Sequence, residues 1–291
     1  MAFTREKEMQ TISPITEQLI DLAISEDLCA GDFTTDAIFT DKDNSKGYLL
    51  AKSDLVLCGQ HIFEFIIEKI ESRALGILRP VTVSFFFKDG DRIKKGDRIA
   101  EFSGSTQILL KAERTALNFL QHLSGVATQT RTLADLLPNA RVVNTRKALP
   151  GLRELQHYAV QCGGGKSHRF NLGGGTMIKD NHIAAAGSIA KAVQKVREFA
   201  PHTLRIEVEV TNLDEVKQAL EAKADIIMLD NMTPAVMKEA CNLIGDRALV
   251  EISGNVTVER AEQIADIPVY CVSCGALTHS VHAADISMRF E

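Results

Sequence analysis

Four short apolar segments decide the fold: LRIEVEV (204–210), DIIML (225–229), ALVEI (248–252) and PVYCV (268–272). They begin 21, 23 and 20 residues apart, which is the repeat expected of consecutive strand–helix units. Apolar strands that alternate with helices are typical of a parallel sheet covered by helices. The spacing therefore predicts four consecutive parallel strands in an α/β domain.

Two further strand candidates precede these four, at Arg141–Asn144 and Thr176–Ile178. The helices between the strands have recognisable N-caps at Ser188, Asn212, Thr233 (followed by Pro234) and Thr257. Six strands are fewer than the eight of a closed barrel. We therefore predict an open, incomplete α/β barrel, and a doubly wound open sheet is the alternative.

The first part of the chain has the pattern of a smaller mixed α/β module. Turns at Asp89-Gly90 and around Gly96-Asp97 separate short strands and predict antiparallel hairpins. The expected elements, in order, are a helix from Ser13-Pro14 towards Gly31, a strand over Tyr48–Leu57, a helix over Gln60–Ser72, strands over Val81–Phe87 and Ile99–Phe102, and two helices over Gln107–Leu123 and Thr128–Leu137.

Composition excludes several classes of protein. With 45% hydrophobic and 24% charged residues in 291, the chain has the make-up of a globular protein with a sizeable core. A net charge of −5 argues against a nucleic-acid coat, and no apolar run is long enough for a membrane span. Met1–Gln10 has no apolar signal region, and six scattered cysteines make no disulfide framework. We therefore expect a cytoplasmic protein.

Positive charge is concentrated in residues 145–182, which we call the basic segment. Six cations against two acids give it a net charge of +4, so the rest of the chain carries −9; the cations are Arg146, Lys147, Arg153, Lys166, Arg169 and Lys179, and the acids are Glu154 and Asp180. Such a concentration in an acidic protein is typical of a binding site for a small anion. A solvated loop surface is the alternative.

Every predicted barrel strand ends in polar or glycine residues. The sets are Thr145-Arg146-Lys147, Lys179-Asp180-Asn181-His182, Glu207 with Glu209, Asp230-Asn231, Ser253-Gly254-Asn255 and Ser273-Cys274-Gly275. The carboxyl ends of parallel strands meet at one rim, which holds the active site of α/β barrels, and the last loops there often bind phosphate. These residues are therefore expected to form one site.

The residue types on this rim indicate its ligand. Arginine binds carboxylate and phosphate groups through paired hydrogen bonds. The carboxylates of Glu209 and Asp230 suit Mg²⁺ or ribose hydroxyls. Together with a glycine loop, these groups predict a phosphorylated sugar bound with a divalent ion. The alternative for the two acids is that they only pair with the nearby cations.

Two other motifs do not support a function. Gly165-Lys166-Ser167 resembles the end of a nucleotide-binding P-loop, but Val160 occupies the position of its first glycine. The spacing of Cys271 and Cys274, and of His279 and His282 after them, matches no zinc site. The two cysteines are interpreted as small core residues. The remaining cysteines are expected to be buried thiols, at Cys29, Cys58, Cys162 and Cys241.

A family resemblance extends over nearly the whole chain. The basic segment and its next residue read TRKALPGLRELQHYAVQCGGGKSHRFNLGGGTMIKDNHI (145–183), which closely resembles the quinolinate phosphoribosyltransferases, also called nicotinate-nucleotide pyrophosphorylases (carboxylating). Further matches occur in family order: EDLCAGDFTTD (26–36), ERTALNFLQHLSGVAT (113–128), EVEVTNLDE (207–215), LDN (229–231), EISGN (251–255) and GALTHS (275–280).

The resemblance implies a fold, a reaction and an assembly. The fold would be an N-terminal α/β sandwich over 1–124, joined by the C-terminal segment 280–291, and an open α/β barrel over 125–279. The reaction would transfer phosphoribose from 5-phosphoribosyl-1-pyrophosphate to quinolinate with decarboxylation, giving nicotinate mononucleotide, pyrophosphate and CO₂ for NAD biosynthesis, with Mg²⁺ as cofactor. The assembly would be a homodimer with shared active sites, or a higher oligomer.

The resemblance also implies roles for individual residues. Substrate-binding positions would be Arg114, Thr145, Arg146, Lys147, His168, Arg169, Lys179, Glu209, Asp230, Ser253, Gly254, Asn255 and Gly275. Catalytic positions would be Lys147, Lys179, Glu209 and Asp230, and Glu209 and Asp230 would bind Mg²⁺ directly or indirectly. The alternatives are a paralogue of the molybdenum-transport-linked type, acting on another acceptor, and a non-catalytic ligand-binding relative. The intact TRK, HR and KDNH motifs favour quinolinate.

Overall fold

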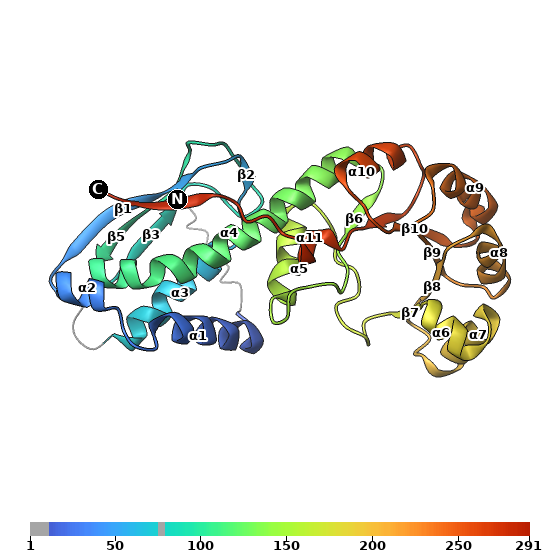
Figure 1. Ribbon diagram of the computed structural model, residues 1–291, viewed down its shortest axis with the longest axis horizontal. Coiled ribbons are helices and arrows are strands. Elements are labelled where there is room, and N and C mark those ends of the chain that lie inside the picture. Colours follow the sequence, from blue (N-terminus) through green and yellow to red (C-terminus); the bar gives the residue numbers. More distant parts are fainter. Residues whose placement is uncertain (1–11, 75–78) are drawn as a thin grey trace, which may run out of the picture. The chain divides into compact units, whose positions relative to one another are not determined.

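The computed structural model describes residues 12–74 and 79–291, which form parts of two compact units (Figure 1). The first unit contains the chain up to Thr128, together with Pro150–Cys162 and His282–Glu291, and the second contains Gln129–Leu149 and Gly163–Val281. The domain limits expected from the sequence assign residues 150–162 to the barrel, whereas their contacts group them with the first unit.

An antiparallel sheet organises the first unit, in the strand order β12-β1-β5-β3. Its strands are β1 (Asn44–Ala51), β3 (Thr82–Phe85), β5 (Arg98–Ser105) and β12 (Ile286–Phe290), and β2 (Leu55–Val56) pairs separately with β4 (Arg92–Ile93). The helices of this unit are α1 (Pro14–Leu28), α2 (Phe33–Ile38), α3 (Gln60–Arg73), most of α4 (Thr106–Leu136) and α5 (Arg153–Cys162). Residues such as Phe63 and Ile66 of α3 are buried in its core.

The C-terminal strand explains why two predicted helices are one. β12 pairs with β1, as the family resemblance implied for this segment. The expected helices Gln107–Leu123 and Thr128–Leu137 are wrong as separate elements, because α4 runs without a break through Gly125. A Cβ at Gly125 would lie 2.2 Å from the carbonyl oxygen of His282. Glycine at this position therefore allows the returning chain to approach the helix and does not end it.

The predicted strand Tyr48–Leu57 is also wrong as a single element. The chain turns after β1 and enters a different sheet at β2. Asp54 lies in this turn and accepts hydrogen bonds from the backbone N–H of Lys95 and the Nζ of Lys94, both at 2.9 Å. A polar turn inside an otherwise apolar run therefore divides it.

A six-stranded parallel sheet forms the second unit, in the order β6-β11-β10-β9-β8-β7. The strands are β6 (Arg141–Val143), β7 (Thr176–Ile178), β8 (Ile206–Val210), β9 (Ile226–Asp230), β10 (Leu249–Ser253) and β11 (Cys271–Ser273). The order follows the chain from β7 to β11 and then places β6 beside β11. The first strand thus neighbours the last, as in a barrel, and β6 and β7 leave it open. The prediction of an open α/β barrel is confirmed.

Helices alternate with these strands as the sequence predicted. They are α6 (Asp180–Ala186), α7 (Ile189–Phe199), α8 (Leu213–Glu221), α9 (Pro234–Ile244), α10 (Val258–Ile264) and α11 (Ala276–His279). The four predicted N-caps are confirmed, because each side chain accepts a backbone N–H from the first turn of its helix. Within the described part of the chain, no helix is both long and apolar enough to cross a membrane.

Candidate active site

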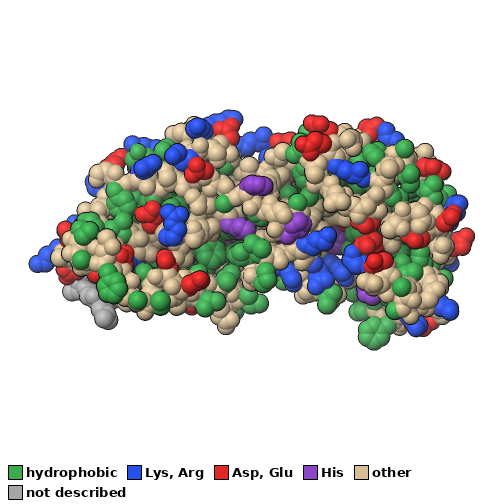
Figure 2. Space-filling model, viewed as in Figure 1, with side chains coloured by type: hydrophobic (Ala, Val, Ile, Leu, Met, Phe, Trp, Pro, Cys, Tyr) green, Lys and Arg blue, Asp and Glu red, His purple; other side chains and the backbone are tan. Residues whose placement is uncertain are grey.

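The carboxyl ends of the barrel strands line a pocket of about 400 Å³. Of the residues expected from the sequence, the pocket contains Thr145, Arg146, Lys147, His168, Arg169, Lys179, Glu209, Asp230, Ser253, Gly254 and Asn255. Figure 2 shows Lys and Arg side chains gathered beside Asp and Glu side chains on this unit. The parallel sheet thus brings together loops that are far apart in the sequence.

Two guanidinium groups dominate the cationic part of the pocket. Arg146 follows β6, and its buried Nε has no hydrogen-bond partner among the described residues. Arg169 donates from Nη1 to the carbonyl oxygen of Gly175 at 2.9 Å. Burial, and the positive charge of Arg146, lower the pKa of Arg169. Because Arg146 and Arg169 repel each other and the Nε of Arg146 has an unused donor, this part of the pocket is suited to bind an anion.

Backbone contacts position the neighbouring Lys147. Its N–H donates to the Oγ1 of Thr145 at 3.1 Å, and its carbonyl oxygen accepts from the Oγ1 of Thr278 at 2.8 Å. Gly275 is close behind, since a Cβ there would lie 3.0 Å from the Cδ of Lys147. Gly275 does not line the pocket, so its contribution is to leave room for Lys147.

The acidic part of the pocket comes from the ends of β8 and β9. Glu209 contacts Lys179 in an ion pair, which agrees with the alternative that this acid pairs with a cation. Asp230 forms no ion pair within the described chain, and its Oδ2 accepts from the Nδ2 of Asn231 at 2.8 Å. Asp230 is therefore available to a ligand in a way that the pairing alternative does not explain.

The loop after β10 has a strained conformation. Gly254 has a φ of 95°, Asn255 one of 47°, and Asn231 in the adjacent loop one of 54°. A Cβ at Gly254 would lie 2.3 Å from the Oδ1 of Asn231, which already accepts from the Nδ2 of Asn255 at 3.1 Å. Left-handed residues in succession turn backbone N–H groups into a concave arrangement that binds anions. The loop is therefore a candidate phosphate site.

Two buried acids lie at the pocket floor, and their association was not predicted. The Nε2 of His168 is 3.4 Å from the Oε2 of Glu251 and 3.6 Å from the Oε2 of Glu207. Burial and the charge of Glu251 raise the pKa of Glu207 to about 8. Burial opposes charge on Glu251, but the hydrogen bond with His168 lowers its pKa. The negative charge is therefore favoured on Glu251, the partner of His168, and the proton is favoured on Glu207.

The sequence does contain a signal for these acids. Glu207 already belongs to the rim set expected from the sequence, whereas Glu251 does not and stands two residues before the expected Ser253. Alternate residues of a strand share a face, so an acid at this spacing points into the same interior. A charged residue inside an apolar strand therefore indicates a buried acid near the site.

His168 is held by the segment that crosses the rim beside β6. Its N–H donates to the Oδ1 of the buried Asn144 at 3.0 Å, and the N–H of Lys166 donates to the carbonyl oxygen of Val142 at 2.8 Å. The basic segment as a whole does not form one patch, since Arg153 and Glu154 lie on α5 in the first unit.

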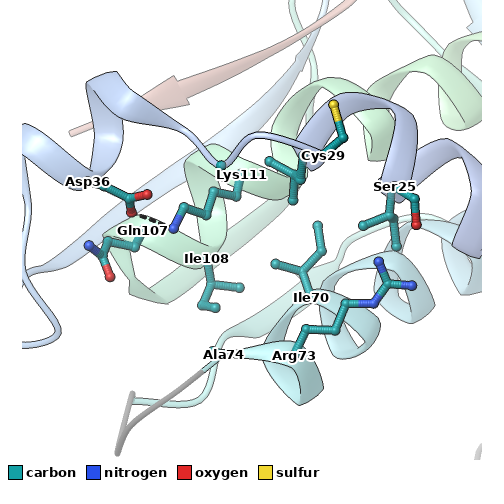
Figure 3. A pocket seen from close by; sticks show the side chains of 12 residues that line it. Ser25, Cys29, Asp36, Ile70, Arg73, Ala74, Gln107, Ile108 and Lys111 are labelled. Carbon is teal, nitrogen blue, oxygen red and sulfur yellow. Dashed lines mark hydrogen bonds and ion pairs between the residues drawn. The ribbon is translucent and has the colours of Figure 1, made fainter.

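A second cavity, of about 610 Å³, lies in the first unit among α1, α3 and α4 (Figure 3). Its cations already have partners: Lys111 is 2.5 Å from the Oδ1 of Asp36, and Arg73 is 2.6 Å from the Oδ1 of Asp21. Although this cavity is larger than the rim pocket, its charges are neutralised, so it is not suited to a multiply charged anion.

Comparison with known proteins identifies the family. The N-terminal domain of quinolinate phosphoribosyl transferase matches residues 32–124, and the C-terminal domain matches residues 126–289. The chain belongs to the quinolinate phosphoribosyl transferase family. The doubly wound alternative is excluded by both this match and the strand order.

Two relatives and one solved structure illustrate the similarity. A probable nicotinate-nucleotide pyrophosphorylase (carboxylating) of Bacillus subtilis is 39% identical over 94% of this chain and 92% of its own length. One from Methanocaldococcus jannaschii is 38% identical over 93% and 95%. The crystal structure of NadC from Streptococcus pyogenes has a TM-score of 0.89 and 40% identity, covering 96% of this chain and 98% of that one.

Besides Gly275, one other position expected from the quinolinate phosphoribosyl transferase resemblance is not in the rim pocket. Arg114 lies on α4 in the first unit, and its side chain is 60% exposed. Its recorded ion partner is the adjacent Glu113, at 3.9 Å. Arg114 thus belongs to a different unit from the other expected site residues, and its side chain is exposed on that unit.

The cysteines agree with the sequence interpretation in part. Cys271 and Cys274 are buried core residues, as predicted, and the Sγ of Cys271 donates to the Oε2 of Glu251 at 3.1 Å. Cys58 is buried, but Cys162 and Cys241 are only partly so. The prediction for Cys29 is wrong, because it is exposed in the segment just after α1.

Proposed function

We propose that this chain catalyses the transfer of phosphoribose from 5-phosphoribosyl-1-pyrophosphate to quinolinate, with loss of CO₂. The observation that carries the proposal is the rim pocket itself, where two unpaired guanidinium groups share one cavity with two carboxylates and a phosphate-type loop. The relatives named as nicotinate-nucleotide pyrophosphorylases support it. The retained charges at every expected rim position argue against a non-catalytic relative.

The cationic part would bind quinolinate. This substrate has two adjacent carboxylates, which Arg146, Arg169 and Lys147 can hold through charge-assisted hydrogen bonds. Holding both carboxylates orients the ring so that its nitrogen faces the sugar carbon. Positioning of this kind accounts for much of the rate enhancement in a two-substrate reaction.

The opposite part would bind the phosphorylated sugar. Residues Ser253–Asn255 would hold a phosphate group through backbone N–H groups. Glu209 and Asp230 would favour the positive charge that develops on the sugar as pyrophosphate departs. They are also oxygen donors of the kind that Mg²⁺ prefers, and Asp230 has no competing cation, so these two residues fit the ion directly or through the pyrophosphate. Bound Mg²⁺ would neutralise charge on the pyrophosphate.

Decarboxylation would follow from the new bond. Once the ring nitrogen is attached to the sugar, it is positively charged, and the C–C bond to the neighbouring carboxylate can break. Its electron pair stays on the ring carbon next to that charge, CO₂ leaves, and the carbon then takes up a proton. Lys147 or Lys179 would stabilise the developing negative charge. No covalent bond to the enzyme is needed.

One incubation tests the activity. Purified protein is mixed with quinolinate, 5-phosphoribosyl-1-pyrophosphate and Mg²⁺, and nicotinate mononucleotide, pyrophosphate and CO₂ are measured. Equal amounts of the three products are expected. If quinolinate yields none of them while another acceptor is phosphoribosylated, the chain is a paralogue with different specificity. If no acceptor is used although the substrates bind, it is a binding protein.

We further propose a shared site in a homodimer, which would give the exposed Arg114 a role in substrate contact. Arg114 matches a family position for substrate contact but does not line the pocket of its own second unit. Arg114→Ala and Lys147→Ala should each be nearly inactive. Refolded together, they should recover about a quarter of wild-type activity, because half of the dimers are mixed and each has one intact site. No recovery despite proven subunit exchange would place Arg114 within its own chain's site.

We also propose a cytoplasmic location, on the basis of the free cysteines. All six cysteines are free, which favours a reducing compartment, and we assign the enzyme to the cytoplasm on this ground. Measuring the fraction of the protein in the cytosol after cell fractionation tests the assignment.

A further inference from the structure

Two thiols and a carboxylate meet in the first unit, apart from the rim pocket. Cys58 lies between β2 and α3, Asp89 in the turn before β4, and Cys162 at the end of α5, 104 residues after Cys58. One donor atom from each lies within 4.8 Å of the other two. We propose that Cys58, Asp89 and Cys162 form a binding site for a soft divalent cation of the zinc type.

Asp89 is already fixed in the orientation that a metal ligand needs. Its carboxylate accepts the backbone N–H of Gly59 at 3.0 Å and that of Gln60 at 3.3 Å, at the start of α3. Its Oδ2 also accepts from the hydroxyl of Tyr158 at 2.8 Å. Metal-binding carboxylates are characteristically held by such additional hydrogen bonds, which orient them for the ion.

The two thiols have the donor chemistry and the spacing for zinc. Thiolate sulfur is a preferred ligand of zinc, and the Sγ atoms of Cys58 and Cys162 lie within 4.8 Å of each other. A zinc–sulfur bond of about 2.3 Å in a tetrahedral site places ligand atoms about 3.8 Å apart. The observed upper limit of 4.8 Å therefore requires only a small contraction. The positive charge of the ion would offset most of the negative charge of two thiolates and one carboxylate.

A cavity beside Asp89 offers an entry route. The Nδ1 of His61 is 3.8 Å from the Oδ2 of Asp89, and its ring packs edge-on against Tyr158. His61 and Tyr158 also line a cavity of about 230 Å³, together with Ser13 and Glu154. An ion can thus reach Asp89 past these two side chains, and a water molecule would complete the tetrahedron.

The test uses the full chain, reduced and freed of metal, with Co²⁺ as a spectroscopic probe and Zn²⁺ as competitor. One equivalent of Co²⁺ should produce the near-ultraviolet charge-transfer band of thiolate ligands, and Zn²⁺ should abolish it. Because loss of a hydrogen bond to a ligand already weakens metal binding about 10- to 100-fold, Cys58→Ser and Cys162→Ser should each weaken it by at least about 100-fold. Asp89→Asn, which keeps an acceptor for α3, should weaken it as well. Cys29→Ser and Cys241→Ser are the matched controls and should bind as the wild type does.

A second measurement needs no substitution, so it stands even if a variant fails to fold. Zn²⁺ should protect Cys162 of the wild-type chain from alkylation, as identified by peptide mass, while Cys29 continues to react. The proposal is overturned if the wild type binds no stoichiometric metal, if the cysteine variants bind it equally, or if Zn²⁺ leaves alkylation of Cys162 unchanged.

Discussion

Replacing Arg169 by alanine should lower the activity strongly while changing the free energy of unfolding little. In the free protein, burial and the charge of Arg146 both disfavour the charged form of Arg169, as its lowered pKa shows. Its favourable interactions are the hydrogen bond to the carbonyl oxygen of Gly175 at 2.9 Å and a weaker attraction to Glu207. Removing the side chain therefore relieves repulsion and loses one hydrogen bond at the same time.

The magnitudes of these effects differ between the free and the bound protein. One hydrogen bond contributes about 0.5–1.5 kcal/mol to stability, and the relieved repulsion offsets it, so the free energy of unfolding should change by no more than about 1 kcal/mol. With quinolinate bound, the variant leaves a substrate carboxylate without its charged partner, which costs about 2–4 kcal/mol. At 1.4 kcal/mol per tenfold, kcat/KM for quinolinate should fall about thirty- to a thousandfold. Arg146→Ala should behave in the same way.

Urea unfolding and steady-state kinetics at varied quinolinate measure the two quantities. Quinolinate should also raise the Tm of the wild type and not that of Arg169→Ala, because a ligand stabilises only the state that binds it. Lys217→Ala, an exposed cation on α8 paired with Asp214, is the control and should change neither quantity. Unchanged quinolinate kinetics in both arginine variants would refute the placement of this substrate. A fall in activity that only follows a loss of folded protein would refute it as well.

Three further changes examine the remaining parts. Glu209→Gln and Asp230→Asn should weaken the use of 5-phosphoribosyl-1-pyrophosphate and Mg²⁺ more than that of quinolinate, because an amide lacks the charge that a divalent ion needs; substrate titrations in which quinolinate affinity falls selectively would reverse the assignment. Gly254→Ala should raise the KM for 5-phosphoribosyl-1-pyrophosphate at least about tenfold while the protein stays folded, since its Cβ would lie 2.3 Å from the Oδ1 of Asn231 and displace the loop; an unchanged KM would contradict the role of this loop. His122 is partly buried, which lowers its pKa, so below its ordinary value of 6.5 the unfolded chain takes up a proton that the folded chain does not. The free energy of unfolding should therefore fall as the pH is lowered from 7 to 5, with a contribution of at most about 1.4 kcal/mol per pH unit, and His122→Gln should make this fall less steep in urea titrations; equal slopes would show that His122 is not responsible.

Local patterns predicted much of this molecule correctly. The repeat of strands between Leu204 and Val272, and the N-caps such as Ser188 and Asn212, depend on neighbouring residues alone. The rim site could be predicted as well, because the carboxyl ends of parallel strands meet at one edge of the sheet. The family resemblance then assigned roles to individual side chains on that edge.

Errors arose where distant segments decided a local conformation. Gly125 continues a helix because the chain near His282 passes against it, and nothing within a few residues of Gly125 reveals that approach. The turn at Asp54 depends on hydrogen bonds from Lys94 and Lys95, about 40 residues away. The basic segment was divided because α5 belongs to the first unit, which depends on packing and not on charge.

The sequence alone thus determined the order of strands and helices and the types of residue that stand at the strand ends, because both follow from short-range periodicity and turn chemistry. Only the tertiary structure decided which charges meet: Lys179 with Glu209, His168 with Glu251, and Arg146 with Arg169. It also decided that Cys58 and Cys162 lie together. The members of these groups lie 20 or more residues apart, so whether they meet depends on sheet register and helix packing, to which no local pattern in the sequence corresponds.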